Sequence, residues 1–530
     1  VLSEGSIYEG TYIEDIAVPL SKGANSFKID FYHHLFDKYL MLMWTEDAAK
    51  ETPEGDEFLK YFEGYVPIPA SVYTHNSFDI KPTSPGIKSL VSNKAPGFGA
   101  SLTSVHPAYD LSEVRPHSFE PRVGDLEFQD DGSLVLCTWD GDIYRMDNVS
   151  STSQGETTVR KIADGLCEPL GITVVDGDIY VLQRWELTKL VDNDNDGIID
   201  EYVNIATFGS NAQFHEWSFG LIYKDGFFYC TTGIAMGHGA DEMSVDRGKA
   251  LKIAMDGSYS HVAYGLKEPN GIGFGPDGQI FVAENEAEYQ PVCQILHIPE
   301  DGKPFYGNKS VEADHLPEDI ERDQPVIWLP QNEIGNSPSQ PILMEDGPYR
   351  GQLIHGEITH GGIKRDFIEK INGQYQGAVF RFTQGLEVGI NRLEYGPDGS
   401  LYAAGLGGAQ DFGHQGHQFG LQRLTYKGTP AFEMLAIRAK SNGLEVEFTK
   451  PLRIGDGTQP SDYKVQQWHY YWTHEGESQE KRDLENLSVQ SVSLSDDRTK
   501  VFLELSGMKK EHVLYVQLQP PFLSSENDQL

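Results

Sequence analysis

The chain has few cysteines, few cationic residues and no long apolar run. Its four cysteines are Cys137, Cys167, Cys230 and Cys293, and none forms the C-x-x-C pair of zinc and c-type haem sites. Free buried thiols and disulfides both remain open for them. No stretch of about 18 apolar residues occurs, so we expect no helix that spans a bilayer. G-x-S-x-G, Walker and kinase motifs are also missing, so these enzyme classes are not favoured.

Positive charge is scarce. The chain has 42 Lys and Arg against 80 Asp and Glu, which gives a net charge of −38. A protein this acidic repels phosphate backbones and anionic membrane surfaces, so we expect neither nucleic acid nor a membrane as a partner. Most of these carboxylates are expected to be solvated, although acidic loops can also hold Ca²⁺.

Helical periodicity is scarce as well, and short alternating apolar runs take its place. The 55 Gly, 26 Tyr and 26 Phe occur in runs bounded by Gly, Asp and Asn. This pattern is typical of an all-β chain. A length of 530 residues exceeds what one hydrophobic core supports, so several domains are expected.

The middle of the chain repeats one unit at a spacing of roughly 45–50 residues. Each unit has an apolar strand, a D-G or similar turn, and a second apolar strand. The two closest copies are GLCEPLGITVVDGDIYVLQ from Gly165 and GLKEPNGIGFGPDGQIFVAE from Gly265. Further copies begin at Gly124, Phe219 and Ile390, and a weaker one begins at Tyr349. Six such units predict a six-bladed β-propeller over residues 119–428.

The two ends of the chain differ from this middle. Residues 1–75 resemble the C-terminal half of a PA14-like β-sandwich, and 76–118 are rich in Pro, Ser and Gly, as in a linker. Residues 429–530 resemble the small Ig-like β-sandwich that often follows such propellers. No signal peptide opens the chain, and Val1 begins in what reads as the middle of a domain. We therefore expect a processed or trimmed product.

One acidic loop has the spacing of a calcium site. In DNDNDGIIDE, Asp192, Asp194 and Asp196 alternate before a glycine, and Asp200 takes the ninth position of an EF-hand-type loop. The twelfth position is Val203, so the bidentate Glu is missing. We expect a stabilising Ca²⁺ here, and the alternative is an acidic hairpin without metal.

The propeller region resembles a known enzyme family. Its D-G strand units are similar to those of soluble glucose/sorbosone dehydrogenase-like proteins. The runs INGQYQGAVFRFTQGLEVGINRLEYGPDGSLYAAG and GLQRLTYKGTPAFEMLAIRAK resemble large, multidomain, secreted bacterial proteins, which often carry a separate cytochrome c module. In that family the propeller holds pyrroloquinoline quinone and Ca²⁺ at one mouth. The resemblance implies a secreted or periplasmic sugar or alcohol dehydrogenase that passes electrons to a cytochrome.

The resemblance also implies site residues. The catalytic base of the family is a His that precedes a strand–turn–strand unit, and His215 occupies that place. A residue just before an innermost strand is expected at the rim of the channel. A bland alternative is a packed structural histidine. The implied cofactor contacts are Lys267, Glu284, Asn285, Glu286, His360 and Arg392.

Several matched positions differ from the family pattern. Lys267 replaces an Arg, Glu268 adds a negative charge beside it, and the Gly-Pro after Glu284 is absent. A carbohydrate lyase or hydrolase, or a non-catalytic polysaccharide-binding propeller, therefore remains open.

Two histidine-containing stretches admit other interpretations. HGEITHGG contains His355, Glu357 and His360, which could suit a transition metal or line the mouth. GGAQDFGHQGHQFG carries Asp411, His414 and His417, most simply in a solvated loop.

Overall fold

The computed structural model describes two short N-terminal strands and most of residues 104–528. Not described are 1–39, 45–63, 69–103, 151–155, 211–214, 235–243, 287–290, 308–321, 408–413, 415–416, 471–480, 520–521 and 529–530. The described residues contain no α-helix, and none of them forms a helix long and apolar enough to cross a membrane. The chain divides into two compact units, Val1–Asn76 and Ser77–Leu530.

In the N-terminal unit, β1 (Leu40–Trp44) and β2 (Gly64–Ile68) pair antiparallel. The rest of the range expected to be PA14-like lies outside the described residues, so that resemblance stays a prediction.

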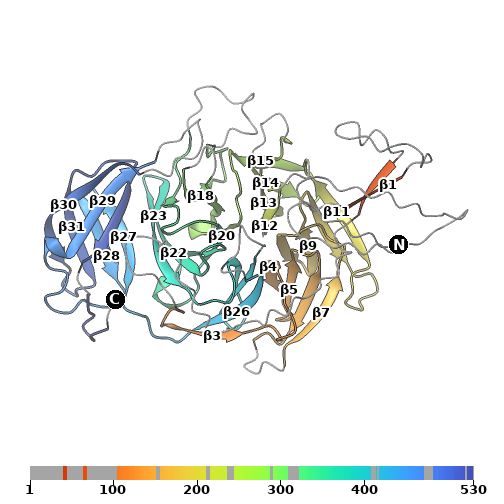
Figure 1. Ribbon diagram of the computed structural model, residues 1–530, viewed down its shortest axis with the longest axis horizontal. Helices are drawn as coiled ribbons and strands as arrows, with labels where there is room; N and C mark the ends of the chain where they lie inside the picture. Colours follow the sequence, from red (N-terminus) through yellow and green to blue (C-terminus); the bar gives the residue numbers. More distant parts are fainter. Residues whose placement is uncertain are drawn as a thin grey trace, which may run out of the picture. The chain divides into compact units, whose positions relative to one another are not determined.

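The second unit contains six four-stranded antiparallel sheets, which are the six blades (Figure 1). Blade 1 is β4 (Val123–Phe128), β5 (Leu134–Thr138), β6 (Ile143–Asp147) and β7 (Thr158–Ala163). Blade 2 is β8 (Gly171–Val175), β9 (Asp178–Leu182), β10 (Glu186–Val191) and β11 (Glu201–Thr207). Blade 3 is β12 (Ser218–Lys224), β13 (Phe227–Thr232), β14 (Lys249–Ala254) and β15 (Tyr259–Tyr264).

Blades 4 to 6 follow the same meander. Blade 4 is β16 (Ile272–Phe274), β17 (Ile280–Glu284), β18 (Cys293–Ile298) and β19 (Ile327–Leu329). Blade 5 is β20 (Pro338–Leu343), β21 (Leu353–Glu357), β22 (Ile363–Ile371) and β23 (Gln374–Thr383). Blade 6 is β24 (Ile390–Tyr395), β25 (Leu401–Leu406), β26 (Phe419–Tyr426) and, from earlier in the chain, β3 (Tyr109–Glu113). The predicted all-β, six-bladed fold is confirmed.

Strand β3 closes the ring, and it corrects the expected boundary between linker and propeller. It lies within 76–118, the range expected to be a linker, yet it pairs with β26 from Tyr109 opposite Tyr426 to Glu113 opposite Gln422. Its sequence, YDLSE, is mostly polar because it is the outermost strand and only Tyr109 is buried. The repeat pattern could not reveal it, since its partner strand follows some 300 residues later.

Neighbouring innermost strands touch around the axis because small residues stand where they meet. A Cβ on Gly124 in β4 would lie 2.1 Å from the carbonyl oxygen of Pro169, just before β8. A Cβ on Gly220 in β12, whose φ is +60°, would lie 2.8 Å from Ile272 of β16. Apolar side chains fill the wedges between blades, as where Leu182 packs with Phe228. No disulfide joins any two of the four cysteines, all of which are described.

The C-terminal region forms a separate six-stranded antiparallel sheet. Its order is β27 (Met434–Lys440), β28 (Gly443–Phe448), β31 (Lys500–Ser506), β30 (Arg482–Leu494), β29 (Tyr463–His469) and β32 (Val513–Leu518). It closes over its own core, which includes Val446, Phe448 and Leu503. The buried guanidinium of Arg365 in blade 5 donates to the carbonyl oxygens of Met434 and Leu435, at 2.6 and 2.8 Å. The Ig-like assignment of this region stays a prediction.

Candidate functional site

One end of the propeller, here called the mouth, collects two kinds of loop. In a meander, the loops that enter the innermost strands and the loops that join second to third strands lie at the same end. His215 precedes β12, Lys267 and Glu268 precede β16, Asn285 follows β17, and His360 follows β21. These five polar residues therefore lie at the same end of the sheets, in the mouth.

His215 and Glu268 form the central pair of the mouth. His215 Nδ1 lies 3.0 Å from Glu268 Oε2, and Lys267 Nζ lies 3.1 Å from the same oxygen. All three side chains are mostly covered, with 13–14% of each exposed. Burial alone would raise the pKa of Glu268, but His215 and Lys267 outweigh it and hold that pKa at about 2. Glu268 is therefore a carboxylate at any working pH.

This pairing sets the tautomer of the histidine. The 3.0 Å contact is at ion-pair distance and is not aligned as a hydrogen bond. A carboxylate beside Nδ1 still favours the proton on that nitrogen, which leaves the lone pair of a neutral His215 ring on Nε2. The backbone of His215 is left-handed, with φ +71°, and its carbonyl oxygen accepts the N–H of Trp217 at 2.8 Å. Left-handed backbone outside glycine is uncommon and is concentrated at functional sites. The arrangement suits a general base.

Glu284 lies directly beneath the Lys267–Glu268 turn. Its two carboxyl oxygens accept the backbone N–H groups of Lys267 at 3.1 Å and Glu268 at 2.9 Å. The side chain is fully buried, and burial raises its pKa to about 8 against the opposing effect of those amides. The family resemblance had implied that Glu284 offers a ligand to the mouth. The side chain instead binds protein backbone.

Trp217 and Glu168 form the opposite side of the His215 turn. Trp217 Nε1 donates to Glu168 Oε2 at 2.7 Å, and Arg184 Nη1 lies 3.3 Å from that oxygen. Glu168 occupies the same place in GLCEP as Glu268 does in GLKEP. The turn is thus held between two carboxylates from repeated loops. Sequence reasoning missed Glu168, although comparing the two repeat copies could have found it.

Apolar side chains pack together beside the mouth loops. They form a buried cluster of Trp139, Leu170, Trp217, Phe219 and Leu406. The rings of Trp139 and Trp217 meet edge to face, with centroids 5.2 Å apart.

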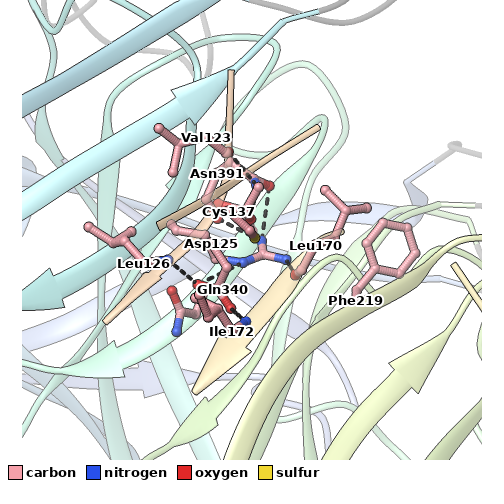
Figure 2. Close-up of polar contacts among 12 residues, drawn as sticks. Val123, Asp125, Leu126, Cys137, Leu170, Ile172, Phe219, Gln340 and Asn391 are labelled. Atoms are coloured by element: carbon pink, nitrogen blue, oxygen red, sulfur yellow. Dashed lines mark hydrogen bonds and ion pairs between the residues drawn. The ribbon is translucent and has the colours of Figure 1, made fainter. Parts of the chain in front are cut away.

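Arg392 lies on the axis and is corrected from its expected role in binding a cofactor. Its side chain is fully buried and contacts Asp125, Asn391 and Leu170. Figure 2 labels these three partners. Nη2 donates to the carbonyl oxygen of Leu170 at 2.7 Å, Nη1 donates to Asn391 Oδ1 at 2.9 Å, and Nε lies 3.5 Å from Asp125 Oδ1. Arg392 therefore ties blades together and is engaged by protein oxygens.

The HGEITHGG segment divides into buried and half-buried groups. His355 Nδ1 lies 2.6 Å from Asp366 Oδ2, and both side chains are fully buried within blade 5. Glu357 accepts the backbone N–H groups of Asn336 and Ser337 at 3.0 and 2.7 Å. His360 is half-buried, burial lowers its pKa, and its Nδ1 has no hydrogen-bond partner among the described residues. His355 and His360 lie in different surroundings. This separation does not support a transition metal bound by both.

The second histidine loop is less solvated than expected. His414 is buried, and a Cβ on Gly361 would meet its ring at 2.7 Å. Asp411 lies outside the described residues.

Within the described part of the chain, only one group of His, Cys, Asp or Glu brings three potential metal ligands together. It consists of Asp192, Asp194 and Asp200, whose ligand atoms lie within 4.8 Å of one another. The carboxylate of Asp196 instead accepts the N–H of Ile198 at 2.7 Å. Three of the four predicted carboxylates therefore converge on one point.

The two cations expected to hold the quinone, Lys267 and Arg392, do not fit a tricarboxylate cofactor. Such a cofactor needs cations that are not already neutralised. Lys267 is paired with Glu268 and also feels the charges of Glu286 and Glu284, and Arg392 is out of reach. Asn285 adds a buried Oδ1 without a hydrogen-bond partner, which is an acceptor and does not attract a carboxylate.

Fold and site together define a six-bladed β-propeller with a histidine–glutamate pair at its mouth. No protein-family model and no curated protein sequence matches the chain. Among solved structures, it is similar to an oxidoreductase of the glucose dehydrogenase type from Thermus thermophilus, with 16% identity, a TM-score of 0.46, and coverage of 60% of this chain and 100% of that one.

Two further similar structures are known carbohydrate-acting proteins. A PQQ-bound aldose sugar dehydrogenase from Streptomyces coelicolor has 16% identity, a TM-score of 0.44, and coverage of 60% of this chain and 99% of that one. A calcium structure of a family AA12 carbohydrate-active enzyme from Trichoderma reesei has 12% identity, a TM-score of 0.46, and coverage of 62% and 99%. The quinone and the calcium belong to those proteins.

Proposed function

We propose that this protein is a carbohydrate-active enzyme that works at the propeller mouth, with His215 as general base and Glu268 as its orienting carboxylate. The observation that carries the proposal is the 3.0 Å pair between His215 Nδ1 and Glu268 Oε2. It directs the basic lone pair to Nε2 and places a carboxylate where the ring becomes positive.

The proposed reaction is cleavage of a carbohydrate bond by hydrolysis or elimination. In hydrolysis, Nε2 takes a proton from water while the water oxygen attacks the electrophilic carbon. In elimination, Nε2 takes a proton from carbon, the C–H electron pair forms a C=C bond, and the C–O bond to the leaving oxygen breaks. In both cases the leaving oxygen receives a proton, and Glu268 stabilises the imidazolium in between. We place this reaction in a secreted or periplasmic protein, as the family resemblance implies.

Oxidation with pyrroloquinoline quinone and Ca²⁺, followed by electron transfer to a cytochrome c, is the competing proposal. It is supported by the sequence resemblance and by the placement of Lys267 and His360 at the mouth. The paired state of Lys267 and the burial of Arg392 oppose it.

We also propose that Asp192, Asp194 and Asp200 hold a structural Ca²⁺. Carboxylate oxygens are the ligands that Ca²⁺ prefers, and these three converge within 4.8 Å. The loop joins β10 to β11 at the outside of blade 2, so this ion would act on stability.

The test compares wild type with His215→Asn. Each protein is incubated with neutral and acidic polysaccharides, and new reducing ends and the absorbance of unsaturated products are measured. Products from wild type alone support the proposal. Dye reduction that requires added quinone and Ca²⁺ would overturn it in favour of oxidation. Binding without any product, seen by affinity electrophoresis, would overturn it in favour of a polysaccharide-binding propeller.

A further inference from the structure

The Lys267–Glu268 turn is held from below by a single side chain. Glu284 Oε2 accepts the N–H of Lys267, and Oε1 accepts the N–H of Glu268. Both oxygens are therefore used, one for each amide. Glu284 is fully buried, so it reaches the mouth only through this turn.

The same device occurs in other blades. Gln183 follows β9 as Glu284 ends β17, since GDIYVLQ aligns with GQIFVAE. Gln183 Oε1 accepts the N–H of Cys167 at 2.6 Å, in the GLCEP loop. Glu357, at the end of β21, accepts two backbone amides of the loop that enters blade 5. A side chain at the end of a second strand thus clamps the loop that enters the innermost strand.

Blades 2 and 4 differ in what this clamp achieves. The amide of Gln183 has one acceptor oxygen and holds one N–H, and the following Glu168 has a left-handed backbone with φ +44°. Glu168 turns to Trp217 and Arg184. The carboxyl of Glu284 holds two N–H groups, and Glu268 turns to His215. Glu284 therefore accompanies the turn that presents Glu268 to the histidine, whereas Glu357 in blade 5 holds a turn at Asn336 and Ser337 that has no such glutamate.

We infer that Glu284 is a positioning residue that orients Glu268, and through it His215, by binding both amides of the turn. This inference rests on the proposed function, because it names the residue that preorganises the proposed base. A displacement of about 1 Å in a catalytic group can cost on the order of 10²-fold in rate. Glu284 contacts the mouth through these two backbone amides.

The variants Glu284→Gln and Glu284→Ala test the inference. Gln places an NH₂ donor against one backbone N–H, so one clamp bond is lost, and Ala loses both. We expect kcat to fall by ~10-fold for Gln and by ~100-fold for Ala, with KM changed less than kcat. Glu369→Gln is the matched control, because Glu369 accepts the N–H of Ala439 at 3.1 Å far from the mouth. It should leave kcat unchanged.

Hydrogen exchange of the peptide containing Lys267 and Glu268 gives a readout that needs no substrate. We expect exchange of these amides to be ~10-fold faster or more in Glu284→Ala than in wild type or Glu369→Gln, with circular dichroism unchanged. Unchanged exchange at the turn, or equal falls in kcat for all three variants, would overturn the inference. If wild type shows no turnover, the proposed function fails, and the exchange result still decides whether Glu284 holds the turn.

Discussion

At the scale of single residues, the mouth is built by pairing charges rather than by leaving them open. Glu268 is shared by His215 and Lys267, and Glu168 is shared by Trp217 and Arg184. Each carboxylate costs free energy to bury, and its partners offset that cost. A histidine in this setting is oriented, covered and next to a fixed negative charge, which are the requirements of a general base.

The residue-scale prediction concerns His215. Asn tolerates left-handed backbone, so His215→Asn should preserve the turn at φ +71° while removing the base. We expect turnover to fall on the order of 10²-fold or more, with the melting temperature nearly unchanged. Initial rates and thermal melts measure the two effects.

His512→Asn is the control for that experiment, because His512 lies in the C-terminal sheet region and its Nδ1 contacts the carbonyl oxygen of Lys510. It should change neither quantity. A large loss of melting temperature in His215→Asn would mean that the histidine is structural, contrary to our assignment.

At the scale of elements, the propeller uses one meander six times and varies its loops. The loop between β10 and β11, which joins a third strand to a fourth, carries the acidic cluster. The mouth is built from loops that enter innermost strands and loops that join second to third strands. This separation lets a stabilising ion and a reactive site occupy different blades without competing for the same carboxylates.

The element-scale prediction concerns the Asp192 loop. If Ca²⁺ binds the folded state only, it stabilises that state by mass action, and chelation should lower the melting temperature by several degrees. Differential scanning calorimetry with chelator and with added Ca²⁺ measures the shift.

Asp194→Asn should abolish the calcium-dependent part, because it removes one of three converging carboxylates. Asp110→Asn, on an exposed carboxylate of β3, is the control and should retain it. A metal-free wild type that melts at the same temperature as the calcium-loaded protein would refute the site.

At the scale of the whole molecule, burial shifts the pKa of several acidic side chains, and these shifts make the stability of the fold depend on pH. Burial raises the pKa of Asp125 to about 6, of Glu127 to about 7 and of Glu284 to about 8. These groups ionise more easily in the unfolded chain, so their contribution to stability is present at low pH and is lost as pH rises through those values.

Groups whose pKa is lowered in the folded state have the opposite effect on stability, and they act at lower pH. Burial lowers the pKa of His297 and His414 to about 4, so they favour unfolding only as pH falls below about 6.5. Burial would raise the pKa of Asp246, but its hydrogen bonds from His261 and the Gly209 amide outweigh burial and hold that pKa at about 2. The partners of Glu268 likewise hold the pKa of Glu268 at about 2. The stability these two acids supply is lost only well into the acid range.

We therefore expect the melting temperature to fall as pH rises from about 6.5 to about 8, because the raised acids lose their protons in the folded state and outweigh the opposing titration of His297, His414, His360 and His417 in the unfolded chain. Glu284 alone would contribute about 2 kcal/mol over this window. Thermal melts at constant ionic strength measure the slope, which should be shallower in Glu284→Gln. A melting temperature that rises over this range would contradict the assignment of these buried acids.

Much of the fold followed from local pattern, and the reason is physical. Alternating apolar runs with D-G turns encode strands and hairpins through neighbouring residues, so the repeated units at Gly165 and Gly265 revealed blades. The family resemblance implied His215, from its place before such a unit. The spacing of Asp192, Asp194 and Asp200 likewise encodes a loop that folds on itself.

Contacts between residues far apart in the chain could not be predicted from local pattern, because they form only when the blades pack together. Three contacts depend on closing the ring. They are the pairing of β3 with β26, the binding of Arg392 on the axis by oxygens from other blades, and the contact of His215 with Glu268. A sequence of strands states which side chains alternate. It does not state which blades face each other across the channel, because that is set by how six twisted sheets pack around one axis.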